Sequence, residues 1–132
     1  MRKERKFKSY SSFLLSLLGT LLFANACSNQ DPIHEAAEMC DVEAIEKYLA
    51  EGADINSNEG RDGETPLHRA ATRGQFEAAK LLISKGAKLN LGRTRDGQTP
   101  LDLADSREHS EIVQLLRENG GKKSSEIKNS QP

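Results

Sequence analysis

The stretch that decides the fold is GETPLHRAA, residues 63–71. It recurs as GQTPLDLAD at 97–105, and a shortened form, DPIHEAA, stands at 31–37, so that Pro32, Pro66 and Pro100 fall at one constant spacing. A second apolar segment follows each copy and ends at a glycine, namely Gly52, Gly86 and Gly120. Three copies at one period indicate a repeat architecture, in which each unit buries its apolar face against its neighbour.

The pattern within one unit predicts two short helices. Thr65 is a good N-cap and Pro66 suits the first helical position, so a first helix is expected to start there. After a turn at 73–75, apolar spacing predicts a second helix from about 76 to 85, and Gly86 ends it. The polar segment 87–96 runs into the Asp-Gly pair of a hairpin turn. The pattern therefore predicts helix–turn–helix units joined by hairpin loops.

These motifs resemble the ankyrin repeat. The resemblance rests on Thr-Pro-Leu-His-x-Ala-Ala and on the endings GADIN (52–56) and GAKLN (86–90). It implies an all-α fold, an ankyrin-repeat solenoid of about three helix–turn–helix units joined by short β-hairpin loops. The usual ankyrin unit is slightly shorter than the spacing found here, so one extra residue is expected near 58–60 and near 92–94.

The resemblance also sets the expected domain limits. The repeat domain should span 31–121, with units at about 31–60, 61–94 and 95–121. The first unit lacks its hairpin and should act as a cap, with Cys40 at the turn position that Gly74 holds. The tail, 122–132, has no periodic apolar pattern and is expected to be disordered.

The N-terminal segment, 1–26, has the features of an export signal. Positions 1–8 carry five Lys and Arg against one Glu, and an apolar run follows at 13–23. That run is about half of the roughly 20 residues that a membrane-spanning helix needs. An Ala-x-Ala exit (24–26) precedes Cys27. We therefore expect an exported bacterial protein that starts at Cys27.

Cys27 raises the question of a lipid anchor. The segment FANAC (23–27) resembles a lipobox, although Ala24 stands where that motif prefers Leu. Lipidation of Cys27, at the head of a short linker (27–30), predicts a lipoprotein of the periplasm or outer membrane. The alternative is a soluble periplasmic or secreted protein, in which Cys27 is a free thiol or pairs with Cys40.

Composition and spacing argue against several functions. Residues 27–132 carry 14 Lys and Arg against 19 Asp and Glu, a net charge of −5, which does not suit nucleic acid. His34 and His68 share one repeat position, where the resemblance implies hydrogen bonds between units, and His109 falls in a turn. No zinc-type spacing and no phosphate-binding loop occurs. We expect no metal, no cofactor and no catalysis.

Protein binding is the expected function, since the resemblance implies binding through the hairpin tips and the concave face of the first helices. In the first unit Glu35, Glu38 and Met39 would line that face. The candidate contact residues are Arg61, Asp62, Glu64, Arg69, Thr72, Arg73, Arg95, Gln98, Leu103, Ser106 and Arg107. The arginines at 69, 73, 95 and 107 are expected to meet carboxylates of an acidic partner.

Several roles agree with such a module. The leading hypothesis is a monomeric cell-envelope adaptor, in a specific form an immunity protein that masks an exported toxin. Small exported ankyrin proteins are also similar to helpers of periplasmic peroxide defence. An exported effector that binds host proteins is the alternative, and an enzyme is the weakest hypothesis.

Overall fold

The computed structural model describes residues 32–58 and 62–131. The predictions for the export signal (1–26), for Cys27 and its linker (27–30) and for Arg61 lie outside these residues. Seven helices form within them: α2 (Pro32–Met39), α3 (Val42–Ala50), α4 (Pro66–Arg73), α5 (Phe76–Ser84), α6 (Pro100–Ser106), α7 (Ser110–Glu118) and α8 (Ser124–Asn129). None of the seven is long and apolar enough to cross a membrane.

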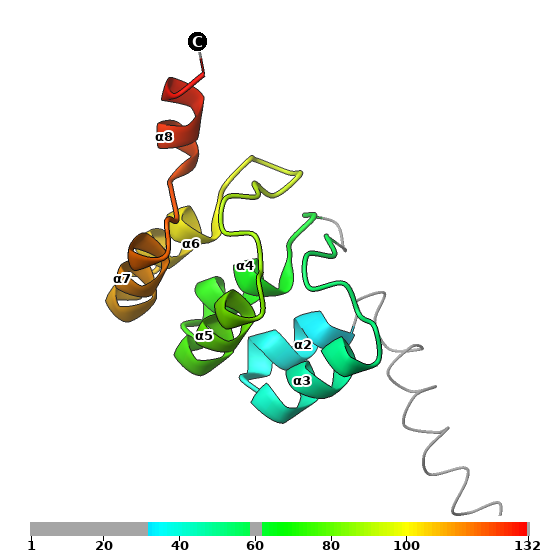
Figure 1. Cartoon of the computed structure of the whole chain (residues 1–132). Coiled ribbons are helices and arrows are strands. Elements are labelled where there is room, and N and C mark those ends of the chain that lie inside the picture. The colour runs from blue at the N-terminus through cyan, green and yellow to red at the C-terminus, as the bar shows by residue number, and fades with distance from the viewer. Residues whose placement is uncertain (1–31, 59–61, 132) are drawn as a thin grey trace, which may run out of the picture. The chain divides into compact units, whose positions relative to one another are not determined.

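Six helices form three stacked pairs (Figure 1). Within each pair, α2 packs on α3, α4 on α5 and α6 on α7, and between pairs the first helices α2, α4 and α6 pack in order. The described residues contain no β-strand. The predicted all-α solenoid of three helix–turn–helix units is therefore confirmed.

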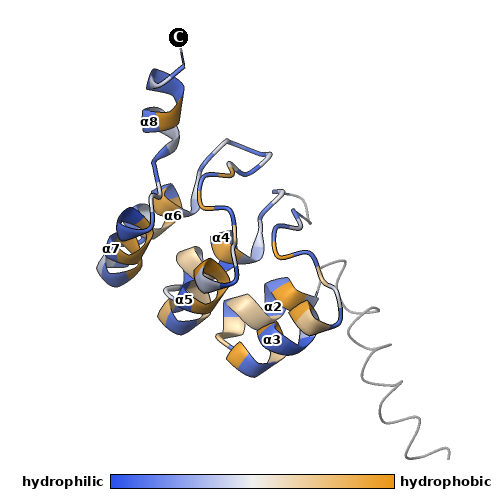
Figure 2. Ribbon diagram, in the orientation of Figure 1, coloured by the Kyte–Doolittle hydropathy of each residue, from blue (hydrophilic) through white to orange (hydrophobic). Residues whose placement is uncertain are grey.

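The core repeats with the same period as the sequence. Ile33, Leu67 and Leu101 occupy one repeat position and are at most 1% exposed. Ala70 and Ala104 are fully buried where the first helices meet, and their small side chains allow the backbones to approach closely. Figure 2 shows apolar residues alternating with hydrophilic ones along α2–α7. Burial of each large aliphatic side chain contributes about 1.5–3 kcal/mol.

Local chemistry starts each first helix where the sequence predicted. The Thr65 hydroxyl accepts from the His68 N–H at 3.3 Å, and His68 Nδ1 accepts from the Thr65 N–H at 3.1 Å. Thr99 and Asp102 form the same reciprocal pair in the third unit. These pairs satisfy backbone donors that a helix N-terminus otherwise leaves free.

A left-handed residue connects the two helices of each unit. Cys40, Gly74 and Glu108 have φ values of 60°, 75° and 61°, and they share one repeat position. In each case the next residue's N–H donates to the first helix at 2.9 Å, as Gln75 does to Ala70. Only glycine adopts this conformation without strain, so the first and third units hold their turns at some cost.

The loops between units are hairpin-like without a strand ladder. In the second loop the Arg93 N–H donates to Gln98 O at 2.9 Å, and the Gly97 N–H donates to Arg93 O at 2.8 Å. Asn56 and Asn90 are the last residues of the two endings. Asn56 accepts the Lys88 N–H of the second unit at 2.8 Å, and Asn90 accepts the Lys122 N–H, just after the third unit, at 2.7 Å. These asparagines thus tie each unit to the next.

The tail differs from the sequence expectation, because it contains helix α8. The Thr99 hydroxyl donates to Lys122 O at 2.8 Å, and Asp102 accepts from the Ser124 N–H at 2.8 Å. Arg117 and Glu126 form an ion pair at 2.9 Å. Burial alone would raise the pKa of Asp102, but the backbone N–H groups of Thr99 and Ser124 lower it. Long-range contacts, which local periodicity does not encode, therefore order residues expected to be disordered.

Candidate functional site

A chain of ion pairs crosses the three units on the side of the first helices. It links, in order, Arg73, Glu38, Arg69, Glu64, Arg93 and Asp96, and we call it the ion-pair network. Its members come from α2, from α4 and from the two loops that join one unit to the next, before α4 and before α6. Three of the pairs, Glu38 with Arg69, Glu38 with Arg73 and Glu64 with Arg93, join residues 29 to 35 apart, which is about one repeat, so stacking brings them together.

Glu64 lies at the centre of this network. Its side chain is 10% exposed, and its two oxygens lie 2.8 Å from Arg69 Nε and 2.7 Å from Arg93 Nη1. Arg93 is 13% exposed and also contacts Asp96 and Gln98. Burial alone would lower the pKa of Arg93, but the carboxylates of Asp96 and Glu64 raise it, so the residue stays charged. Partly buried pairs of this kind are costly to break.

The ion-pair network changes the prediction that four arginines are available to bind the carboxylates of an acidic partner. Arg69 donates to Glu38 at 2.8 Å and its side chain is only 20% exposed. Arg73 pairs with the same carboxylate, and Arg95 pairs with Asp62 at 3.3 Å. Three of the four arginines therefore already meet carboxylates of their own chain. Arg107 is exposed and forms no ion pair within the described residues.

Two predicted contact residues are buried, which is a correction to the predicted site. Leu103 is 5% exposed, although it stands at the repeat position of the half-buried Arg69. Glu64 is 8% exposed and is committed to the ion-pair network. The sequence placed both on a helix face or loop that should be open, but both are buried in the folded chain, and Glu64 lies between Arg69 and Arg93.

The other candidate residues divide between structural bonds and open surface. The Thr72 hydroxyl donates to His68 O at 2.8 Å, and the Ser106 hydroxyl donates to Leu103 O at 2.9 Å. Gln98 accepts from Arg93 through its side chain. Arg73 and Arg95 remain 59% and 67% exposed despite their ion pairs. The surface open to a partner is thus centred on Arg73, Ser106 and Arg107 with the loop residue Arg95, and we call it the first-helix surface.

The repeated histidines connect units rather than bind a ligand. His34 Nε2 donates to Glu64 O at 2.8 Å, and His68 Nε2 donates to Gln98 O at 3.1 Å. These bonds are the ones that the resemblance implied. Burial lowers the pKa of His68 to about 4, with a partial offset from the Gln98 carbonyl. His68 is therefore neutral near pH 7, which suits a ring that both accepts and donates.

The described residues contain no group of three or more His, Cys, Asp or Glu that could hold a metal ion. Cys40 is half-buried and packs against the core, and it lies in the turn before Asp41, the N-cap of α3. The described surface offers hydrogen-bonding, charged and apolar groups. These are the means by which one protein surface recognises another.

Sequence reasoning missed Arg93 and Glu38 as partners in the network. A signal existed, because Glu64 and Arg93 are 29 residues apart and Glu38 and Arg69 are 31 apart. In a stacked repeat, opposite charges at nearly one period are neighbours across a unit boundary. The choice among several such pairs nevertheless depends on side-chain geometry.

Comparison with known proteins agrees with this architecture. A family model described as ankyrin repeats (3 copies) matches residues 33–127. The match extends beyond the predicted domain end at 121 and takes in most of α8. A search of curated proteins gives no match.

Proposed function

The chain belongs to the ankyrin-repeat family, whose repeats are a protein-interaction module, and from this premise we propose that it is an exported adaptor of the bacterial cell envelope. It binds one protein partner through the first-helix surface. The observation that carries this proposal is that some charged residues hold the repeat stack together while others remain exposed at its surface. Arg69 and Glu64 stabilise the stack, whereas Arg73, Arg95 and Arg107 project from it.

Arg73 and Arg107 favour an acidic patch on the partner. They occupy one repeat position, at the C-terminal ends of neighbouring helices α4 and α6. Two exposed guanidinium groups on adjacent parallel helices offer bidentate donors to carboxylates. Arg is also among the residues that most often dominate the binding energy of an interface.

Charge reversal on the first-helix surface tests this proposal. The pair Arg95→Glu and Arg107→Glu avoids Arg69, whose reversal would place a new carboxylate beside the largely buried Glu38 and Glu64. Reversal of Arg95 also places a carboxylate beside Asp62, but both of these side chains are more exposed to water. We expect the double variant to lose at least about tenfold in affinity for a partner captured from envelope extract. Lys80→Glu, an equal charge change per site at an exposed position of α5, is the control. Unchanged binding of the double variant would remove the first-helix surface from the proposal.

Export and anchoring form a separate part of the proposal, supported by residues 1–27 of the sequence. We expect labelled palmitate to enter the chain, and Cys27→Ala to abolish that labelling and release the protein from membrane fractions. Cys40→Ala serves as the control, because Cys40 lies in the repeat domain. Recovery of unlabelled wild-type protein in the soluble periplasm would favour the alternative without a lipid anchor. Recovery outside the cell would favour the effector role.

The finer role is either immunity against an exported toxin or assistance to an exported enzyme. Gene neighbours separate these, since a toxin gene next to this one favours immunity and a catalase gene favours the accessory role. Mixing the purified protein with the neighbour's product, and measuring whether its activity falls or rises, tests either form directly.

A further inference from the structure

The first unit has an open stacking face. Positions in the middle unit that meet the preceding unit are fully buried, as Ala78 and Leu82 show. The residues at the same positions in the first unit are Ala44 and Tyr48, and both are only half-buried. The reason is that α3 packs against α5 on one side, while no described helix packs on its other side.

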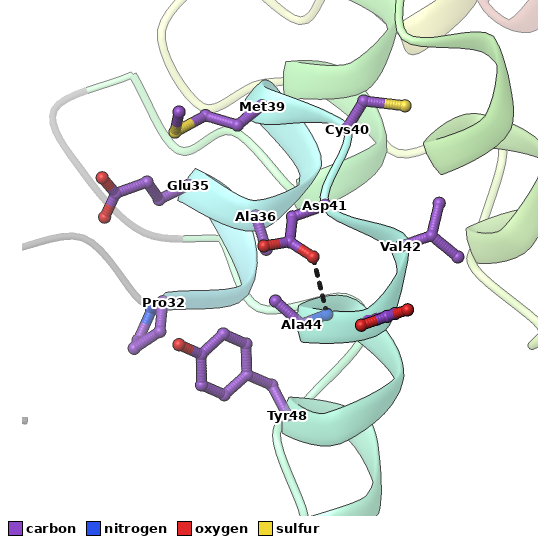
Figure 3. A pocket seen from close by; sticks show the side chains of 10 residues that line it. Pro32, Glu35, Ala36, Met39, Cys40, Asp41, Val42, Ala44 and Tyr48 are labelled. Atoms are coloured by element: carbon purple, nitrogen blue, oxygen red, sulfur yellow. Dashed lines mark hydrogen bonds between the residues drawn. The ribbon is translucent and has the colours of Figure 1, made fainter. Parts of the chain in front are cut away.

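This open face is hollowed into a groove of about 530 Å³ between α2 and α3. Its lining includes the apolar side chains of Pro32, Met39, Val42 and Tyr48. Figure 3 shows Tyr48 beside Pro32 at one end of the groove and Met39 at the far end of α2. A terminal unit of a repeat protein normally presents a polar outer face, so an apolar groove here is a departure that indicates an occupant.

Met39 is the most distinctive residue of the groove. It is 70% exposed, and it is the single exposed large hydrophobic side chain among the described residues. The second and third units carry Arg73 and Arg107 at this repeat position. Methionine is flexible and polarisable, and it adapts to apolar partners of varied shape.

Carboxylates surround the apolar floor. Glu35, Asp41 and Glu43 line the groove, and no Lys or Arg is among the described residues that do. One cation lies beside the groove: the Lys47 ammonium lies over the Tyr48 ring, 6.0 Å from its centre, against the three carboxylates. At the repeat positions of Glu35 and Asp41 the middle unit has Arg69 and Gln75 instead, so the acidic rim is particular to the first unit.

We propose that this groove, lined by Met39, Tyr48 and the carboxylates of Glu35, Asp41 and Glu43, binds a basic amphipathic helix of a partner protein, which continues the repeat stack. An apolar stripe of that helix fills the space that a preceding unit would fill, and flanking Lys or Arg side chains meet the acidic rim. The groove shares no residue with the first-helix surface, although Met39 occupies the repeat position of Arg73 and Arg107. Variants at Arg95 and Arg107 and variants in the groove therefore test the two binding modes separately.

A labelled peptide tests the proposal on the full chain. The probe is a fluorescein-labelled peptide KLLKKLAKLLKKA, with one version that replaces every Lys by Glu and another that replaces every Leu by Ser. Fluorescence anisotropy should show binding of the basic amphipathic peptide that weakens as salt rises. The two altered versions should bind at least about tenfold more weakly, because one lacks the positive charges that meet the acidic rim and the other lacks the apolar side chains that fill the groove.

Variants of the protein locate the bound peptide. Met39→Ser and the double change Glu35→Lys with Glu43→Lys should each weaken binding at least about tenfold. Glu77→Lys is the matched control, because Glu77 is exposed at the repeat position of Glu43 but lies outside the groove. Circular dichroism should give the wild-type helical spectrum for all of them, since Met39, Glu35 and Glu43 are exposed.

Several results would overturn the proposal. These are the absence of binding, equal binding of the Ser-substituted peptide, or an equal loss in Glu77→Lys, which would indicate charge attraction alone. Sedimentation velocity tests whether a second copy of the chain occupies the groove instead. Concentration-dependent self-association that Met39→Ser removes would show that a second copy of the chain covers the groove.

Discussion

Lowering the pH should destabilise the repeat stack through one buried ring. The His68 side chain is fully buried, its Nδ1 accepts the Thr65 N–H at 3.1 Å, and its Nε2 donates to Gln98 O at 3.1 Å. A proton on Nδ1 would face the Thr65 N–H, so the bond from the Thr65 N–H to the ring, which is one half of the reciprocal capping pair of α4, would be lost. Burial is the largest cause of the lowered pKa of about 4, against an ordinary value of 6.5.

The size of the effect follows from the difference between these two pKa values. Between pH 6.5 and 4 the unfolded chain takes up a proton at His68 that the folded chain refuses, so stability falls as pH falls. The full difference corresponds to about 3 kcal/mol of unfolding free energy, of which about 2 kcal/mol is lost between pH 7 and pH 5. Asp96, Asp102 and Glu126 also have lowered pKa values, but their ordinary values lie at or below 4.5, so their losses come at lower pH.

Urea unfolding followed by circular dichroism at pH 7 and pH 5 measures this loss. The comparison variant is His68→Asn, which keeps an acceptor for the Thr65 N–H but does not titrate. Its free energy of unfolding at pH 7 should be lower than that of the wild type, yet it should change little on going to pH 5. If both proteins lose the same free energy between the two pH values, His68 is not the source of the pH dependence and the argument fails.

Three further predictions concern the network and the turns. Glu64→Ala should lower the free energy of unfolding by about 2 kcal/mol, because it removes the carboxylate that Arg69 and Arg93 share and leaves each with one carboxylate partner, Glu38 or Asp96, and Glu64→Gln should cost less in the same urea titration. Gly63→Ala should lower the melting temperature of the protein by more than Gly97→Ala does. Both glycines have positive φ, but a Cβ at 63 would lie 2.1 Å from Thr94 Oγ1, whereas one at 97 meets nothing within 4 Å; equal melting temperatures would contradict this. Glu108→Gly should raise stability by roughly 0.5–1 kcal/mol, since an exposed side chain at φ 61° is strained; a lower melting temperature would show that the Glu108 side chain contributes more than its strain costs.

The parts of the fold that follow from local chemistry could be predicted from the amino-acid sequence. Thr65 with Pro66 set the start of α4, and the constant spacing of the repeat set the number of units and the positions of their cores. The place of Cys40 in the turn also followed, because the repeat aligns it with Gly74. Each of these depends on neighbours within a few residues or on regular periodicity.

The candidate site could be read only in part. The sequence identified the repeat positions that face outward, and Arg73, Arg95 and Arg107 are exposed there. It did not distinguish these residues from Glu64 and Leu103, which are buried in the folded chain. Repeat position alone describes an average unit, whereas burial depends on the particular side chains above and below.

The sequence by itself determined the helical repeat, its caps and the helix boundaries, because these depend on short-range hydrogen bonds and on the spacing of apolar residues. Tertiary structure decided which charges are already paired, why α8 is ordered and where an apolar face is left open. Glu38 meets Arg69, Asp102 holds Ser124, and Met39 stays exposed only once the units are stacked. The physical reason is that ion pairing and burial depend on distances through space, and stacking sets these distances between residues far apart in the chain.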